Sequence, residues 1–164
     1  MDFQLYLIKG EENSGKTTVC WKILNLLQSH SLIECYHLWR TSYSEGIVYD
    51  STNKIYKKNN NPVDFVTILS VRCKSSTKKI AIISAGDDDT YLKKQIYDML
   101  ANDVQHIICC CRSVDKKGSA LHMLKSEFSK HNFSDSNIKK LEKNKNTVEE
   151  DMVANSVFTI ITSI

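Results

Sequence analysis

The first third of the chain changes from a continuous apolar run to a helical pattern. Residues 3–9 are rich in apolar side chains, and the run stops at Gly10, as is typical of a short strand. Beyond the polar residues 11–15, apolar side chains recur at intervals of three or four, the spacing of one helix face: Val19, Ile23, Leu26 and Leu27. This pattern predicts a strand, a loop and a helix over residues 16–29.

The middle of the chain contains three more apolar runs. Residues 32–39 have the composition of a strand, which we expect to join a parallel sheet. Residues 64–73 and 79–84 are rich in Val and Ile, and the five residues between them are too few for a crossover helix. The last two runs are therefore predicted to pair as an antiparallel hairpin. Before them, residues 41–62 are polar and end in Asn59-Asn60-Asn61-Pro62, which indicates a loop or a mobile lid.

The second half of the chain continues to alternate between helical and strand-like patterns. Residues 107–111 are entirely apolar, which favours a central parallel strand buried on both faces. The other expected elements are two helices, a polar surface segment that is partly helical, a short helix and a closing strand, at residues 90–101, 119–131, 132–146, 148–154 and 157–161. Strands that alternate with helices predict an α/β fold: a three-layer sandwich with a mainly parallel sheet and one antiparallel hairpin. The length of 164 residues suits a single domain, residues 1–164.

Composition narrows the possible partners and the compartment. Lys and Arg number 22 against 19 Asp and Glu, and a net charge of +3 is too small to indicate a nucleic-acid or membrane partner. The chain has no long apolar run and no signal-peptide pattern at its start, so we expect a cytoplasmic protein. The six cysteines contain no Cys-x-x-Cys pair, and we expect them to be buried, reduced thiols.

The residues between the first predicted strand and helix form a motif with chemical content. Gly10-Glu11-Glu12-Asn13-Ser14-Gly15-Lys16-Thr17 matches the pattern G-x-x-x-x-G-K-[ST] at every fixed position. Such a loop turns successive backbone N–H groups toward phosphate oxygens at the start of a helix. Lys16 is placed to reach the β- and γ-phosphates, and the Thr17 hydroxyl is placed to bind Mg²⁺.

Through this motif the chain resembles the P-loop NTPase superfamily. The resemblance is specific in the first 30 residues, and over the rest of the chain it is a resemblance of predicted architecture. The resemblance implies a P-loop fold of a small bacterial kinase-like or GTPase-like protein. It implies that a nucleoside triphosphate and Mg²⁺ bind at Gly10, Asn13, Ser14, Gly15, Lys16, Thr17 and Thr18. The stretch Asn13–Thr18 is also similar to the loop of GTP-binding accessory proteins of molybdopterin-guanine dinucleotide synthesis.

The acidic residue expected at the end of a second strand departs from the family pattern. The run Ile80–Ile83 ends in Ser84, and the first acid, Asp87, follows Gly86. We expect this hairpin strand to lie beside the phosphate loop, with Asp87 as the metal and catalytic carboxylate and the Gly86 N–H near the γ-phosphate. The run Asp87-Asp88-Asp89 also fits a plain acidic helix N-terminus.

Two of the three arginines follow predicted parallel strands. Arg40 and Arg112 come at the carboxyl ends, where open α/β sheets bind ligands, and a guanidinium there suits a phosphate. Arg112 is therefore a candidate catalytic residue together with Lys16 and Asp87, while Arg40 could equally be a surface charge.

The function that these residues indicate is Mg²⁺-dependent nucleotide binding. No Asn-Lys pair continues into the N-K-x-D pattern that reads guanine, which favours ATP over GTP. The expected activity is that of a small kinase or phosphotransferase that acts on a small-molecule or protein acceptor. A regulatory NTPase switch and a non-catalytic nucleotide sensor are the alternatives.

Overall fold

The structure is a computed structural model of the chain and describes residues 3–41, 46–128, 137–142 and 146–164, with the side chains of residues 36–41 excepted. Its strands are β1 (Gln4–Gly10), β2 (Ile33–Thr41), β3 (Ile47–Asp50), β4 (Ile55–Lys58), β5 (Asn61–Pro62), β6 (Phe65–Arg72), β7 (Thr77–Ile83), β8 (His106–Arg112) and β9 (Ile138–Lys140). Its helices are α1 (Lys16–Ser29), α2 (Asp89–Ala101), α3 (Ala120–Phe128) and α4 (Thr147–Thr162).

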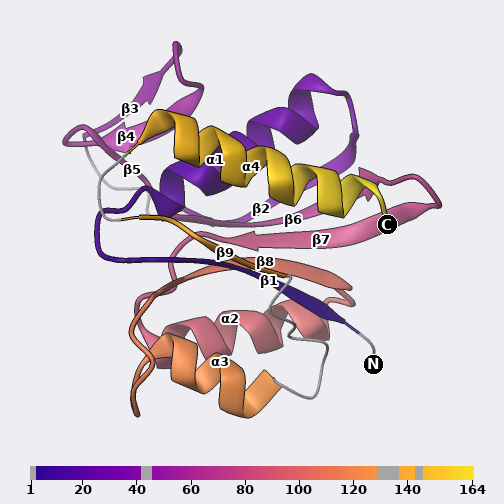
Figure 1. The fold of residues 1–164 in the computed structure, drawn as a ribbon. Helices are drawn as coiled ribbons and strands as arrows, with labels where there is room; N and C mark the ends of the chain where they lie inside the picture. The colour runs from indigo at the N-terminus through magenta and orange to yellow at the C-terminus, as the bar shows by residue number, and fades with distance from the viewer. Residues whose placement is uncertain (1–2, 42–45, 129–136, 143–145) are drawn as a thin grey trace.

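Within the described residues, six strands form the main sheet in the order β2-β6-β7-β8-β1-β9. Strands β7, β8, β1 and β9 run parallel, whereas β6 is antiparallel to both of its neighbours. Strand β2 is antiparallel to β6, and β6 is antiparallel to β7, so the edge strand β2 points in the same direction as β7 and β1. The carboxyl ends of β1, β2, β7 and β8 and the amino end of β6 therefore meet at one edge of the sheet, on the left in Figure 1.

Helices cover both faces of the sheet, so the molecule has three layers. Helices α1 and α4 lie on one face, and α2 and α3 lie on the other (Figure 1). Successive side chains of β1 enter different cores: Leu5 and Leu7 pack under α2 and α3, whereas Tyr6 and Ile8 pack under α1 and α4. The chain is thus a mixed α/β structure.

Several expectations from the sequence are confirmed. The predicted hairpin is formed by β6 and β7, with Val66 opposite Ile83. The predicted central strand is β8, which pairs parallel with both β7 and β1 and is buried along its length up to Arg112. Helices α1 and α2 begin and end within one residue of their predicted bounds. The last part of the helix expected at residues 119–131 lies outside the described residues.

The prediction for the carboxyl terminus was wrong. A short helix and a strand at residues 157–161 were expected, but Thr147–Thr162 form one continuous helix. Helix α4 packs against α1 (Figure 1), and its buried residues have the spacing of one helix face: Glu150, Val153, Ala154, Val157 and Ile161. A short apolar run fits a buried strand and a buried helix equally well, and residues 157–161 belong to that ambiguous class.

The polar segment 41–62 is not simply a loop. It contains a second, three-stranded antiparallel sheet of β3, β4 and β5, while residues 42–45 lie outside the described part. This small sheet is held against α1, because Ile55 is buried and the rings of Trp21 and Tyr56 lie 5.8 Å apart. The Asn25 side chain on α1 also donates to the backbone oxygens of residues 53 and 54.

Two strand placements differ from expectation. Strand β9 falls in the polar region 132–146, where only a surface segment was expected, and it pairs parallel with β1 through Leu7–Lys9. Residues 132–136 and 143–145 of that region lie outside the described part. Strand β7 was expected beside β1, but β8 lies between them. The sheet therefore separates the phosphate-loop strand from the hairpin by one strand.

The cysteines follow the expected pattern except for one. Cys20, Cys73, Cys109, Cys110 and Cys111 are buried, whereas Cys35 on the edge strand is exposed, and all six are free thiols. The Cys20 and Cys110 sulfurs lie 3.3 Å apart between α1 and β8.

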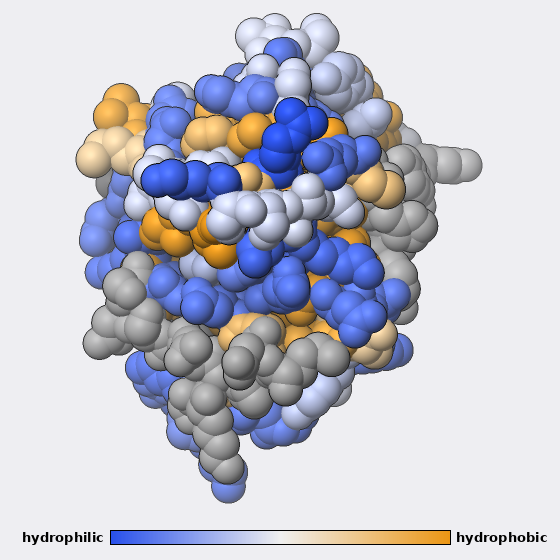
Figure 2. Space-filling view, turned by 90° about the vertical axis from the view of Figure 1, so that its right-hand side faces the viewer, coloured by the Kyte–Doolittle hydropathy of each residue, from blue (hydrophilic) through white to orange (hydrophobic). Residues whose placement is uncertain are grey.

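The surface at the amino ends of the parallel strands lies opposite the phosphate loop. Where it is coloured in Figure 2, this surface is mainly hydrophilic, with apolar side chains in small separate groups.

Candidate functional site

The phosphate loop connects β1 to α1 through two left-handed backbone positions. Asn13 has φ 59° and Gly15 has φ 98°. A side chain at Gly15 would also collide with the buried Glu150 carboxylate, because an added Cβ would lie 2.8 Å from its Oε1. The left-handed conformation therefore favours glycine before Lys16, and a larger residue there would also have to displace the end of the Glu150 side chain on α4.

The Lys16 side chain folds back over this loop. Its Nζ donates to the backbone oxygens of Gly10 at 3.2 Å and Glu11 at 2.8 Å, and the side chain is only 9% exposed. At the start of α1, Gly15 supplies no side-chain cap, and the first turn has no acidic residue. The first N–H groups of this helix and the Lys16 ammonium are thus arranged to attract an anion.

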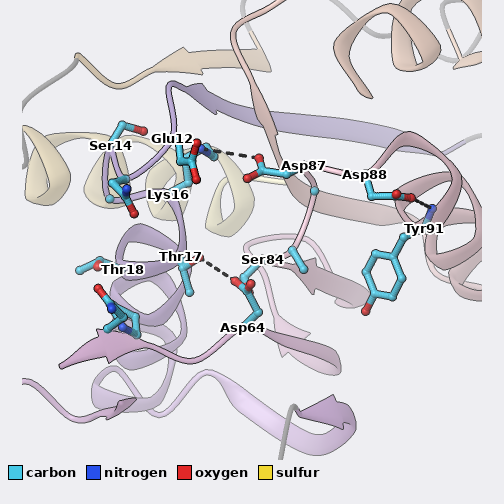
Figure 3. A pocket seen from close by; sticks show the side chains of 16 residues that line it. Glu12, Ser14, Lys16, Thr17, Thr18, Asp64, Ser84, Asp87, Asp88 and Tyr91 are labelled. Atoms are coloured by element: carbon cyan, nitrogen blue, oxygen red, sulfur yellow. Dashed lines mark hydrogen bonds and ion pairs between the residues drawn. The ribbon is translucent and has the colours of Figure 1, made fainter. Parts of the chain in front are cut away.

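A pocket of about 400 Å³ opens beside the loop (Figure 3). Loop and helix residues from Glu12 to Thr18 form one wall, and Asn61, Pro62 and Asp64 form the second. The third wall comes from the segment between β7 and α2 and from Tyr91 on α2. All of these segments reach the sheet edge at which the carboxyl ends of the parallel strands meet.

Asp64 is the functional candidate that the sequence analysis missed. The Thr17 hydroxyl donates to Asp64 Oδ1 at 2.7 Å, and the Ser84 hydroxyl donates to the same oxygen at 3.0 Å (Figure 3). The Phe65 N–H in turn donates to Ser84 Oγ at 2.8 Å, which fixes the hydroxyl between β6 and β7. A signal in the sequence was available: Asp64 immediately precedes a strand that was predicted to be antiparallel, so it lies at the edge where the parallel strands end.

Asp87, the expected metal carboxylate, has different partners. It lies 3.9 Å from Lys16 Nζ and 3.2 Å from Arg112 Nε. Arg112 also pairs with Glu12 of the loop at 3.4 Å, so the structure brings together the three residues predicted to be catalytic: Lys16, Asp87 and Arg112. Asp87 as a metal ligand stays a prediction, because in the structure the carboxylate bonded to Thr17 is that of Asp64.

The remaining predicted nucleotide-binding residues lie around the same pocket. Asn13, Ser14, Gly15, Thr18 and Gly86 line it, and Gly10 ends β1 at the base of the loop. Ser14 Oγ is buried in the loop and has no hydrogen-bond partner among the residues that the structure describes, so a bound phosphate could satisfy this polar atom. Arg40 in β2 is paired through its backbone with Val66 in β6, and the Arg40 side chain is not among those that the structure describes.

The oxygen atoms around Thr17 suit a Mg²⁺ site that is shared between the protein and a bound nucleotide. Among the described residues, no group of three or more His, Cys, Asp or Glu side chains is arranged to hold a metal by itself. Mg²⁺ is commonly bound through one or two carboxylates together with substrate phosphates and waters. The Thr17 hydroxyl and the Asp64 carboxylate fit that type of site, in which the nucleotide completes the coordination.

The cysteine next to the site is unsuited to nucleophilic chemistry. Burial, and next the neighbouring Cys110, raise the pKa of Cys111 to about 12. The thiol is therefore protonated at neutral pH, whereas nucleophilic attack requires the thiolate.

Comparison with known proteins places the chain in no family. Neither the protein-family models, nor the curated proteins, nor the solved structures include a match to it. In the part of the chain that the structure describes, no helix is both long enough and apolar enough to cross a bilayer.

Proposed function

We propose that the protein binds a nucleoside triphosphate with Mg²⁺ at the phosphate loop and transfers the terminal phosphate to an acceptor. The observation that carries this proposal is the position of Lys16, held over the loop at the start of an uncapped helix. Phosphoryl transfer depends mainly on positioning and electrostatic stabilisation, which such a site can provide. The fold that this function implies is that of a P-loop NTPase.

The polar residues in and beside the pocket take distinct roles in this proposal. The loop N–H groups and Lys16 bind the β- and γ-phosphates, and Arg112 stabilises charge on the phosphate that is transferred. Thr17 and Asp64 would hold Mg²⁺, which when bound neutralises phosphate charge. Ser84 keeps the Asp64 carboxylate in place through its hydrogen bond.

The shape of the pocket favours a kinase or phosphotransferase. The pocket extends beyond the loop to Pro62 on β5 and Tyr91 on α2, and this part of it is where the proposal places an acceptor beside the terminal phosphate. The ion pairs of Asp87 with Lys16 and Arg112 favour a second candidate, a regulatory NTPase or sensor, because bound phosphate would rearrange them. The missing N-K-x-D pattern makes ATP the first nucleotide to test.

Calorimetric titration tests nucleotide binding, with ATP and GTP each measured with and without Mg²⁺. We expect Mg-ATP to bind and the Lys16→Ala variant to lose at least about tenfold in affinity, because a charge-assisted contact to phosphate is removed. Lys94→Ala removes an exposed lysine from α2 and serves as the control. Equal affinity of wild type and Lys16→Ala would refute the proposal.

A second experiment separates transfer from hydrolysis. The protein is incubated with γ-labelled ATP and a pool of small metabolites, and the products are resolved by chromatography. A labelled small molecule supports the kinase, whereas slow release of phosphate alone supports the regulatory NTPase.

A further inference from the structure

Four charged side chains of alternating sign form a chain across the mouth of the phosphate loop. Glu12 pairs with Arg112 at 3.4 Å, Arg112 with Asp87 at 3.2 Å, and Asp87 with Lys16 at 3.9 Å. The close-up shows the Asp87 carboxylate directed toward the loop and joined to it by a dashed line (Figure 3). A carboxylate therefore lies between the two cations that the proposed function assigns to phosphate.

The backbone on both sides of Asp87 is fixed. Gly86 is pressed against β8 so closely that an added Cβ would lie 1.5 Å from the backbone oxygen of Cys110. On the other side, the Asp88 side chain caps α2 by accepting from the Tyr91 N–H at 2.6 Å. The backbone thus holds the Asp87 side chain at the mouth of the loop.

The side chain of Asp87 nevertheless remains able to leave. It is 45% exposed, and Arg112 is 44% exposed, so both can turn toward solvent without breaking a core contact. Lys16 differs from these two side chains, because it is only 9% exposed and is bonded to the loop. An incoming anion would therefore displace Asp87 rather than Lys16.

We propose that Asp87 is an internal anion that occupies the subsite of the terminal phosphate when no nucleotide is bound. This inference rests on the proposed function and deepens it. A terminal phosphate must displace Asp87 to reach Lys16 and Arg112, because two anions cannot share the same two cations without repulsion. A diphosphate, which ends one phosphate earlier, leaves the Asp87–Arg112 pair in place. Asp87 is then the part of the pocket that distinguishes a triphosphate from a diphosphate.

The test compares the affinities of ATP and ADP, both with Mg²⁺, for wild type, Asp87→Asn and Asp89→Asn. We expect Asp87→Asn to bind ATP about fivefold more tightly, the size of effect that a partly exposed ion pair produces, with ADP affinity unchanged. Asp89→Asn removes the same charge from the first turn of α2, outside the pocket lining, and should bind both nucleotides as wild type does.

Each other outcome overturns the inference in a recognisable way. Weaker Mg-ATP binding by Asp87→Asn would make Asp87 a metal ligand, as the sequence predicts, and not an internal anion. If Asp89→Asn also bound ATP more tightly, or if Asp87→Asn bound ADP more tightly as well as ATP, the effect would come from the lost negative charge in general and not from a terminal-phosphate subsite. If wild type and both variants bind neither nucleotide, the proposed function itself fails and the inference fails with it.

Discussion

Two carboxylates face the same pocket, and their partners separate their roles. Asp64 accepts from the hydroxyls of Thr17 and Ser84, whereas Asp87 is paired with Lys16 and Arg112. A carboxylate surrounded by hydroxyl oxygens suits a hard cation, and a carboxylate between two cations resembles a bound anion. In the proposed function, the same residue type would therefore serve opposite electrostatic purposes, with Asp64 before β6 and Asp87 after the neighbouring strand β7.

This difference leads to a prediction for Asp64→Asn. The amide can still accept from Thr17, so the pocket should keep its shape while losing the charge that would hold Mg²⁺. We expect the gain in ATP affinity on adding Mg²⁺ to fall at least about tenfold, with metal-free binding little changed. Calorimetry with and without Mg²⁺ measures both quantities.

Asp103→Asn is the matched control for that experiment. Asp103 is exposed and has φ 58°, a conformation that Asn tolerates well, and it does not line the pocket. An Asp64→Asn protein whose affinity responds to Mg²⁺ as wild type does would remove Asp64 from the proposed metal site.

At the scale of single elements, the sequence predicted correctly those features that depend on residues close together in the chain. The loop from Gly10 to Thr17 could be identified because its glycines, lysine and threonine are adjacent in sequence. Helix α4 was divided wrongly because the short, mainly apolar run 157–161 fits a strand as well as a helix, and only packing against α1 settles its conformation. The small sheet was missed because its strands are only two to four residues long and lie within a segment, 41–62, that is polar over most of its length.

The continuity of α4 can be tested at Asn155, an exposed residue near its middle. Proline there removes an N–H and collides with the preceding turn, so Asn155→Pro should lower the free energy of unfolding by about 3 kcal/mol. Asn155→Ala should change it by less than about 0.5 kcal/mol, because Ala is a good helix former on an exposed face. Urea unfolding of both variants provides the measurement, and equal stabilities would contradict a helix at this position.

At the scale of the whole molecule, the order of strands decides which residues meet. Asp64 joins the site only because β6 is antiparallel to its neighbours and starts at the edge where β1 and β7 end. The insertion of β8 between β1 and β7 places Arg112 beside Asp87. The β6–β7 hairpin was predicted from the sequence, but the position of β8 depends on pairings between residues distant in sequence, which composition and periodicity could not predict.

The burial of the cysteines gives a prediction about the folded molecule as a whole. Burial raises the pKa of Cys73 and Cys109, and a side-chain contact with Cys110 and then burial raise that of Cys20. At neutral pH we expect an alkylating reagent to modify only Cys35 quickly, because thiolates react and these buried groups stay protonated. Mass spectrometry after native labelling counts the modified residues, and rapid labelling of the cysteines in β8 would contradict the buried strand.

The most direct test of the central claim is a crystal structure with Mg²⁺ and a non-hydrolysable ATP analogue. We expect the terminal phosphate against Lys16 Nζ and the loop N–H groups, the metal at Thr17 and Asp64, and the Asp87 carboxylate turned away from Lys16. An analogue bound elsewhere on the molecule, or a phosphate loop left empty at saturating concentration, would contradict the account.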